Sequence, residues 1–198
     1  MNNFLDITQN VANFALRDQR RWEELRYLFH PNASISVTWY SGPIEGLIER
    51  LAKMTAAGKW STSKHWIGAS RVTIEGNRAL SGTDVAIFAR AKSGPIEADV
   101  TCYLRFFDRF ERRDDGIWRI ASRTAIYEKD RMDPVRPSFL YPLAYRLDGF
   151  NRFPRPYRHL AAGLVRSGQV LAKPIIETGT KEESELLRDA KMWLATQN

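Results

Sequence analysis

Two residues of this sequence have side chains and surroundings suited to proton transfer, Asp18 and His65. Histidine is the side chain that most readily takes up or releases a proton near neutral pH. A carboxylate that is hydrogen-bonded to the ring fixes its tautomer and stabilises the imidazolium, which raises its basicity. A pair of Asp18 and His65 would therefore form a general base. A histidine beside an aromatic residue such as Trp66 is also common as a purely structural residue, and spacing alone does not decide between the two.

The argument for burying Asp18 comes from the residues around it. Apolar residues recur at steps of three and four between residues 4 and 29, which indicates one helical face. Asp18 falls on this face, four residues after Phe14 and four before Trp22. An unpaired buried carboxylate costs several kcal/mol, so we expect a hydrogen-bonding or cationic partner. The residues of the apolar face are Phe4, Ile7, Val11, Phe14, Trp22, Leu25 and Phe29.

Few other residues have a pattern that indicates chemistry. His30 precedes Pro31, and His159 lies near the C-terminus, so a surface or capping role is expected for both. The sequence has no HxH, HExxH or clustered Cys/His spacing, and one His with one Asp is short of a catalytic metal's ligand set. It also lacks GxGxxG, GxxxxGK[ST] and GxSxG. We therefore expect neither a metal nor a cofactor, which favours cofactor-free chemistry or plain ligand binding.

Helices and a long sheet must position the pair. The helical pattern of residues 4 to 29 is expected to end before Pro31, with a possible corner at Asp18 and Gln19. Residues 33 to 40 are typical of a short strand, and residues 44 to 58 of an amphipathic helix. Long strands are then expected over residues 70 to 75, 78 to 91, 96 to 111 and 117 to 128. Strands of about 14 residues span roughly 45 Å, so the sheet must twist and curl.

The fold class expected from this order is α+β, with N-terminal helices over the concave face of a long curved antiparallel sheet, which leaves a pocket. Residues 131 to 198 differ, because they hold six of the nine prolines. Helical patterns there cover residues 157 to 172 and 182 to 195. We interpret these residues as an extension that wraps the domain of residues 1 to 130 or builds a subunit interface.

Composition bounds the class of protein. A chain of 198 residues is expected to form one domain with its own core. The single cysteine, Cys102, excludes an intramolecular disulfide and lies in a strand pattern that predicts a small core residue. We find no signal peptide and no apolar run near the roughly 20 residues of a membrane span, so we expect a soluble cytoplasmic protein. The net charge of +7 is spread along the chain, which favours a salt-bridged surface over nucleic-acid binding.

Three segments resemble the SnoaL-like branch of the nuclear transport factor 2-like superfamily: RDQRRWEELRYLFHPNASI, SKHWIGASRVTIEGNRA and DRFERRDDGIWRIASRTAIYEKD. In that branch an aspartate heads a D-x-x-x-W-x-x-L-x-x-L-F segment, a histidine opens a strand, and a Gly-x-Trp-x-Ile strand closes the sheet. The resemblance covers about residues 5 to 130. It implies a conical α+β barrel around a deep apolar pocket, with the catalytic Asp–His pair at Asp18 and His65 and a pocket arginine at Arg123. It also implies a homodimer or homotrimer.

The role of Arg123 raises a question of strand parity. Trp118 and Ile120 share one face of their strand, and simple alternation puts Arg123 on the other. All three face inward only past a β-bulge; otherwise Arg123 is an exposed or ion-paired strand residue. Tyr103 and Phe107 share parity and should face the same side. The candidate substrate-binding residues, each of which could equally be a simple core residue, are Trp39, Tyr40, Trp66, Tyr103 and Phe107.

Our leading hypothesis is a cofactor-independent lyase or dehydratase that acts on a hydrophobic, aromatic small molecule. His65, oriented by Asp18, would remove a proton, and Arg123, Tyr103 or Tyr40 would stabilise the developing oxyanion or leaving group. Related dehydratases have a further polar residue on the strand after the histidine, where this chain offers only Arg90, so their substrates are not carried over. The alternative is a non-catalytic ligand-binding or assembly subunit, like the β subunit of ring-hydroxylating dioxygenases, which has no need for the pair.

Overall fold

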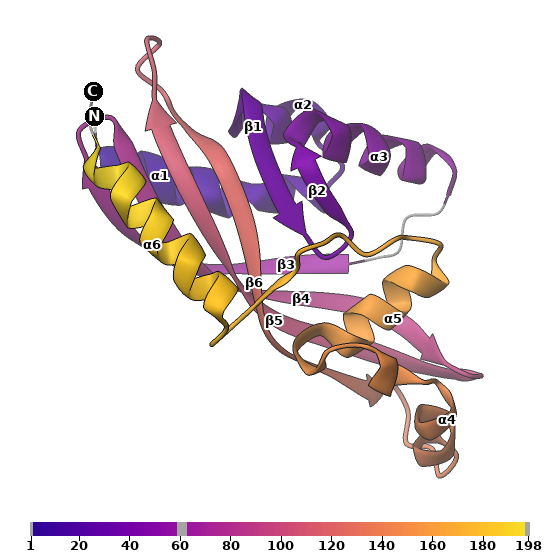
Figure 1. Ribbon diagram of the computed structural model, residues 1–198. Coiled ribbons are helices and arrows are strands. Elements are labelled where there is room, and N and C mark those ends of the chain that lie inside the picture. The colour runs from indigo at the N-terminus through magenta and orange to yellow at the C-terminus, as the bar shows by residue number, and fades with distance from the viewer. Residues whose placement is uncertain (1, 59–62, 197–198) are drawn as a thin grey trace.

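The computed structural model describes residues 2–58 and 63–196, in which helices flank one long curved sheet (Figure 1). In chain order the elements are α1 (Asn3–Ala12), the 3₁₀ helix η1 (Asn13–Arg17), α2 (Trp22–Tyr27), β1 (Phe29–Val37), β2 (Tyr40–Pro43), α3 (Ile44–Ala56), β3 (Ser63–Glu75), β4 (Arg78–Ser93), β5 (Ile96–Arg112), β6 (Trp118–Pro134), α4 (Tyr141–Leu147), the 3₁₀ helices η2 (Phe150–Arg152) and η3 (Arg155–Tyr157), α5 (Arg158–Arg166), β7 (Ile176–Glu177) and α6 (Lys181–Ala195). The α+β class expected from the sequence is confirmed.

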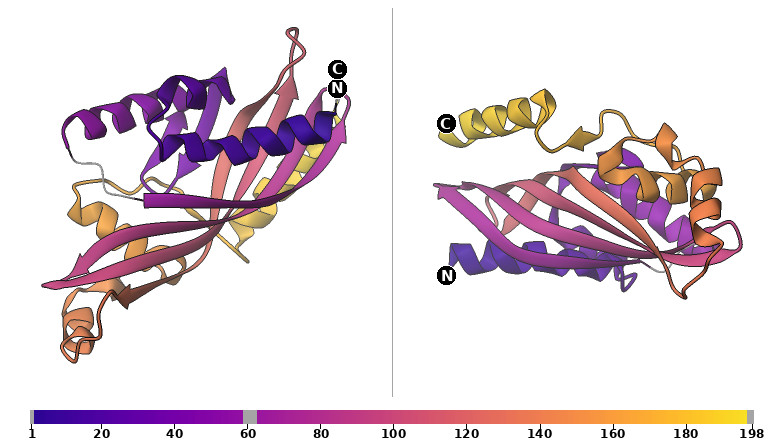
Figure 2. Two further views of the ribbon diagram at one scale, coloured as in Figure 1. Left: turned by 180° about the vertical axis from the view of Figure 1, so that it is seen from behind. Right: turned by 90° about the horizontal axis from the view of Figure 1, so that it is seen from below.

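The sheet has the strand order β2-β1-β6-β5-β4-β3, with β7 beside β6. Strands β3 to β6 form the expected antiparallel meander. Outside this meander the sheet is mixed, because β1 and β7 both run parallel to β6. Side-chain alternation carries no information about strand direction, so the sequence pattern could not show this. The order begins at β2 and ends at β3, so the sheet curves like part of a cone without closing into a barrel (Figure 2).

The two faces of β5 are covered by different parts of the chain. Leu104, Phe106 and Phe110 point to the concave face and join the main core with α1, α3 and α5. Phe107 points to the other face, where it packs with Leu80 and α6. Figure 2 shows α1 and α6 on opposite sides of the sheet. Cys102 is fully buried on the concave side, as the strand pattern predicted.

Two bulges in β6 place the side chains of Ile120, Arg123 and Asp130 all on the concave face. Phe110 pairs with Ile120 but Arg109 pairs with Ser122, so one residue, Ala121, is inserted between them. Because a bulge shifts the alternation by one residue, Ile120 and Arg123 are both buried. This is the bulge that the parity argument required. A second register shift, after Tyr127, lets the Asp130 side chain point inward as well, where it is fully buried.

The N-terminal helical pattern is divided into three pieces. The corner forms at the expected place, after Asp18, where Arg20 adopts a left-handed φ of 61° that is uncommon for a residue with a side chain. The helical part ends before Pro31, as expected, but it ends already at Tyr27, and β1 begins at Phe29 instead of residue 33. Pro31 lies between the pairings of Phe29 and Ser34 with β6, where the register shifts. A residue without an N–H is tolerated at such an irregularity.

The residues beyond β6 pack on both faces of the sheet. The η3 helix and α5 contact the concave side through β6 and β5, β7 extends the sheet, and α6 crosses the convex side (Figure 1). Both helical patterns foreseen near the C-terminus are helices, as α5 and α6. No helix in residues 2–58 and 63–196 is long and apolar enough to span a membrane.

Candidate functional site

Asp18 and His65 are directly hydrogen-bonded. Asp18 follows the last residue of η1, and His65 is the third residue of β3. The His65 ring atom Nδ1 lies 2.9 Å from Oδ1 and 3.1 Å from Oδ2 of Asp18. The backbone N–H of His65 also donates to Oδ2, at 2.6 Å. One carboxylate thus holds both the ring and the main chain of the same residue.

The protonation state of the pair follows from these contacts. Burial alone would raise the pKa of Asp18, but the hydrogen bonds and charges of His65 and Arg17 outweigh it and hold this pKa below its usual value. The ionised carboxylate only accepts hydrogen bonds, so Nδ1 of His65 carries the proton and Nε2 keeps a lone pair. Burial, and then the charge of Arg17, lower the pKa of His65. Asp18 raises the pKa of His65, as expected, but burial and the charge of Arg17 outweigh it, so the pKa of the ring is lowered overall. The ring is neutral at pH 7 and ready to accept a proton.

Arg17 completes the group. Its guanidinium Nη1 donates to Asp18 Oδ1 at 2.9 Å and lies 3.5 Å from Nδ1 of His65. Because that Nδ1 carries a proton, the second contact brings a positive charge near the ring without a hydrogen bond. Side chains three residues apart eclipse one another in a 3₁₀ helix, so Phe14 and Arg17 of η1 lie on one face and both reach the same cavity.

His65 lines a cavity of about 120 Å³ on the concave side of the sheet. An engineered cavity of about 150 Å³ in another protein binds benzene, so this volume suits roughly one aromatic ring. Leu160 and Leu164 of α5 form part of its wall, so residues outside the expected domain complete the cavity. Its polar wall residues are Arg17, Thr38, Ser63, His65, Tyr127 and Ser167. Its apolar wall residues are Phe14, Val37, Trp39, Leu47, Leu51, Met54, Ile87, Ala89, Leu104, Phe106, Leu160 and Leu164.

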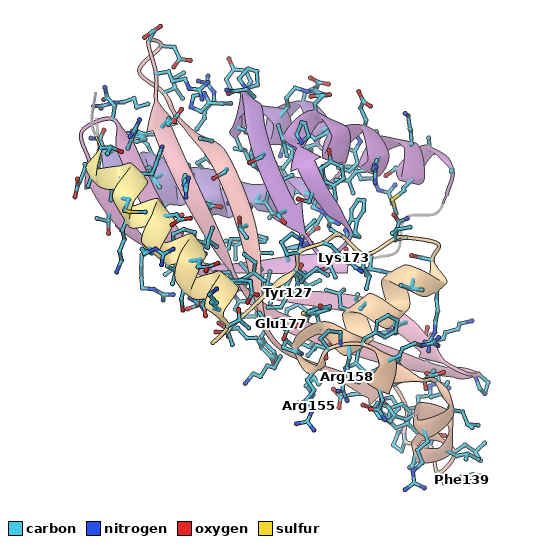
Figure 3. All side chains as sticks on the ribbon, in the orientation of Figure 1. Tyr127, Phe139, Arg155, Arg158, Lys173 and Glu177 are labelled. Atoms are coloured by element: carbon cyan, nitrogen blue, oxygen red, sulfur yellow. The ribbon has the colours of Figure 1, made fainter. Side chains whose placement is uncertain are left out.

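Tyr127 is a wall residue that sequence reasoning missed. Its hydroxyl oxygen accepts the backbone N–H of Thr38 at 2.9 Å and is hydrogen-bonded to the Thr38 hydroxyl. Burial raises the pKa of Tyr127, which keeps it protonated. Figure 3 labels it in the middle of the sheet, near Glu177, with which it pairs in the sheet. Its position between the two bulges of β6 is the signal that could have found it.

Arg123 faces inward but does not line the cavity. Its guanidinium makes two hydrogen bonds of 2.7 Å to Asp108, and both side chains are fully buried. The guanidinium carbon lies 4.5 Å from the ring centre of Phe14 and 4.3 Å from that of Phe106, two wall residues. Its charge is therefore neutralised behind an aromatic part of the wall. Asp108 was not foreseen, because an acid within the alternating segment DRFE looks like a solvent-exposed residue.

The expected aromatic wall is only partly present. Trp39 lines the cavity. Tyr40 is buried elsewhere: its hydroxyl donates to the Pro43 carbonyl at 2.7 Å and sits where a side chain on Gly46 would clash. The prediction that Trp66, Tyr103 and Phe107 line the cavity is wrong. Trp66 follows the inward-facing His65 and is 67% exposed, and Tyr103 and Phe107 share the convex side of β5.

A second acid–histidine pair ties α5 to the sheet. Nδ1 of His159 lies 2.8 Å from Oδ1 of Asp130, and the Tyr145 hydroxyl lies 2.8 Å from Nε2. Oδ2 of Asp130 accepts the backbone N–H groups of His159 and Leu160 at 2.6 and 3.0 Å, at the start of α5. The expectation of a surface role is wrong for His159. It is also wrong for His30, which is buried with Nε2 3.0 Å from the Glu111 carbonyl oxygen.

The described part of the chain has no group of three or more His, Cys, Asp or Glu side chains that could hold a metal ion. A neutral imidazole on an apolar wall, with a carboxylate behind it, can take a proton from a bound molecule.

The chain matches one protein family and is similar in sequence to known fungal proteins. A model of the SnoaL-like domain matches residues 5–124, a segment that holds both Asp18 and His65. Pea pathogenicity protein 2 of Fusarium vanettenii is 31% identical over 147 residues, which cover 73% of this chain and 61% of that protein. An uncharacterized protein of Aspergillus terreus is 30% identical over 171 residues, which cover 73% of this chain and 58% of that protein. The chain thus spans less than two thirds of the length of either relative.

Solved structures share the fold at lower identity. A hexachlorocyclohexane dehydrochlorinase (LinA, type 2) is 16% identical, with a TM-score of 0.50 over 68% of this chain and 87% of that chain. A nuclear transport factor 2-like superfamily protein from Salmonella enterica serovar Typhimurium is 15% identical, with a TM-score of 0.51 over 69% of this chain and 94% of that chain. At these identities the similarity is one of fold.

Proposed function

The chain belongs to the family of SnoaL-like domain proteins, and on that premise we propose that it is a cofactor-independent lyase that acts on a small aromatic compound. The observation that carries the proposal is the hydrogen bond of 2.9 Å between Asp18 and Nδ1 of His65. It leaves the lone pair of Nε2 on a neutral ring in the wall of an apolar cavity.

The reaction proposed is an elimination. Nε2 of His65 takes a proton from a substrate carbon, and the electron pair of that C–H bond forms a new C=C bond. The leaving group departs from the neighbouring carbon with its bonding pair. When the leaving group is hydroxide, the imidazolium returns the proton to it and water leaves, so one histidine completes the cycle. Asp18 stabilises the imidazolium while it exists.

The wall supports a hydrophobic aromatic substrate, because 12 of its 18 residues are apolar, three of them aromatic. The dehydrochlorinase that shares the fold is named for an elimination, which agrees with the reaction class. The expected role of Arg123 as an electrophile finds no support in its contacts, since Asp108 takes its charge.

The test of the base uses 5-nitrobenzisoxazole, a small aromatic probe. Loss of its ring C–H proton to a base breaks the N–O bond and releases a coloured nitrile-bearing phenolate. The purified protein should accelerate this reaction above free imidazole, and His65→Ala should lower the rate by at least about 10²-fold. Lys64→Ala is the matched control, since Lys64 is the exposed neighbour on the same strand and should leave the rate unchanged. Equal rates for His65→Ala and the parent protein would refute the mechanism.

A screen of single-ring aromatic alcohols and diols then addresses turnover. Loss of water creates a conjugated double bond, which is followed by ultraviolet absorbance. A lyase converts at least one compound with dependence on His65. A non-catalytic ligand-binding or assembly subunit would bind members of the panel without converting any of them, and this result would favour that alternative.

A further inference from the structure

Arg17 is a feature of the cavity wall that a general base alone does not explain. Its side chain is 12% exposed, and among the described wall residues it is the one arginine or lysine. Burying a guanidinium is costly even when it is paired with a carboxylate, as Arg17 is with Asp18. A cation that is kept on the wall of an otherwise largely apolar cavity indicates a use for its charge.

The balance of charges shows what that use can be. Before reaction, Arg17 offsets Asp18, Arg123 offsets Asp108, and His65 is neutral. Proton transfer creates two new charges, an imidazolium and a substrate anion. Asp18 is hydrogen-bonded to the ring and stabilises the imidazolium. The substrate anion then needs its own stabilising group in a place that excludes water, and Arg17 is the cation on the wall beside His65.

We propose that Arg17 binds the oxygen on which the substrate's negative charge develops, and that the substrate is a single-ring aromatic compound whose acidic carbon adjoins a carbonyl or carboxylate. This inference rests on the proposed function and names its substrate class. The size limit comes from the cavity volume of about 120 Å³. The requirement for an oxygen comes from the guanidinium, whose planar N–H groups suit carboxylate and enolate oxygens.

The reaction then has two balanced steps. Nε2 of His65 removes the proton from the carbon next to the carbonyl, and the C–H electron pair forms an enolate whose oxygen carries the charge beside Arg17. The enolate re-forms the carbonyl, and its electrons make the C=C bond as hydroxide leaves the next carbon. The hydroxide takes the proton from the imidazolium and departs as water. No oxidant, reductant or metal is needed.

Tyr127 is the competing oxygen-binding group on the wall. Its hydroxyl already accepts the Thr38 backbone N–H and is bonded to the Thr38 hydroxyl. Both groups are already hydrogen-bonded inside the protein, but Tyr127 carries no charge, which makes it the weaker choice for a full negative charge. The two residues are therefore compared directly in the test.

The test measures binding of benzoate and of its neutral isostere benzamide at neutral pH by calorimetry. The parent protein should prefer benzoate by about tenfold or more, which corresponds to roughly 1.4 kcal/mol. Arg17→Met should abolish the preference, Arg17→Lys should keep part of it, and Tyr127→Phe should keep most of it. Equal affinity of the parent for both compounds would overturn the inference, whether or not Arg17→Met folds. A preference lost in Tyr127→Phe but unchanged in Arg17→Lys would also overturn it.

This outcome is independent of the lyase mechanism, because benzoate binding transfers no proton. If His65→Ala loses the reaction with 5-nitrobenzisoxazole but the parent binds benzoate and benzamide equally, the result supports His65 as the general base and refutes the proposed role of Arg17. If the parent prefers benzoate and the preference depends on Arg17, but no proton transfer to His65 is found, the result supports the oxyanion site and refutes the lyase mechanism.

Discussion

Asp18 holds His65 twice, through the ring Nδ1 at 2.9 Å and through the backbone N–H at 2.6 Å. The second bond joins the end of η1 to the start of β3, so the position of the base is fixed by the main chain as well as by ring orientation. A carboxylate can accept both bonds at once because it has two oxygens and no hydrogen.

Replacing Asp18 with asparagine should therefore damage the base without removing it. The amide can donate as well as accept, so the ring can turn its protonated nitrogen toward the cavity. We expect the rate with 5-nitrobenzisoxazole to fall by at least about 10²-fold, as for other acids that orient a catalytic histidine. The variant Asp18→Asn/His65→Ala should be no slower than His65→Ala alone, since the two residues act as a unit. Additive losses would show that Asp18 acts separately.

The pH dependence of the rate follows from the lowered pKa of His65. The base works only when neutral, so kcat/KM should rise with pH through the folded pKa of His65, below its ordinary value of 6.5, and be level at neutral pH. Burial is the larger cause of the shift, and the charge of Arg17 is the next. Arg17→Met should therefore move the acid limb to higher pH. An NMR titration of the His65 ring should move in parallel; an acid limb above 6.5 in the parent would contradict the assignment.

Stability should depend on pH in the same range. Between the folded pKa of His65 and its ordinary value of 6.5, the unfolded chain binds more protons than the folded chain. The free energy of unfolding therefore rises with pH across this window and falls on acidification. Asp18, whose pKa is lowered from 3.8, adds a further loss at lower pH. Urea unfolding at several pH values should show a smaller slope for His65→Ala in the upper window.

Much of this site could be predicted from the sequence, and the exceptions have physical causes. The place of Asp18 on an apolar face predicted its burial. The parity of Trp118 and Arg123 left two possibilities open, and the bulge in β6 decides for an inward-facing Arg123. Alternation does not show which face of β5 is concave, so the sequence does not reveal that Phe107 packs against α6 and away from the cavity. The position of α5 over the cavity depends on Asp130 and His159, whose contact no local pattern reveals.

The buried pair of Arg123 and Asp108 should matter more for stability than for the rate. Arg123→Met leaves a carboxylate buried without its partner, and we expect a loss of about 3–5 kcal/mol in the free energy of unfolding. Arg123→Met/Asp108→Asn removes both charges and should lose less. The folded double variant should keep its rate with 5-nitrobenzisoxazole within about tenfold of the parent, well short of the loss expected for a catalytic group. A loss like that of His65→Ala would restore a catalytic role for Arg123.

The two leucines of α5 on the cavity wall should limit substrate size. Leu164→Ala removes part of the wall and enlarges the cavity, at a cost toward the lower end of about 2–5 kcal/mol because the residue is only partly buried. We expect 2-naphthoate to bind the variant more tightly than it binds the parent, while benzoate binds more weakly. Calorimetry with both ligands checks this. Val165→Ala, next to it on an exposed position, is the control and should change neither affinity.

Asp130 does not line the cavity, but it should affect the position of α5, whose leucines do. Its buried carboxylate accepts three hydrogen bonds, from the His159 ring and from two backbone N–H groups at the start of α5. Asparagine has one accepting oxygen and no charge, so Asp130→Asn leaves at least one buried donor unsatisfied. We expect a loss of about 1–3 kcal/mol in the free energy of unfolding. Asp133→Asn is the control, since Asp133 pairs with Arg131 at the surface and should change stability by less than about 0.5 kcal/mol.

The reason to expect a functional effect as well is that Leu160 belongs both to this network, through its backbone N–H, and to the cavity wall, through its side chain. Loosening the start of α5 should weaken benzoate binding and raise KM, while the acid limb of the rate profile stays in place because Asp18 and His65 are untouched. Tyr145→Phe removes only the bond to Nε2 of His159 and should have a smaller effect on both stability and binding. Unchanged benzoate affinity in a destabilised Asp130→Asn protein would show that the cavity keeps its shape without this anchor.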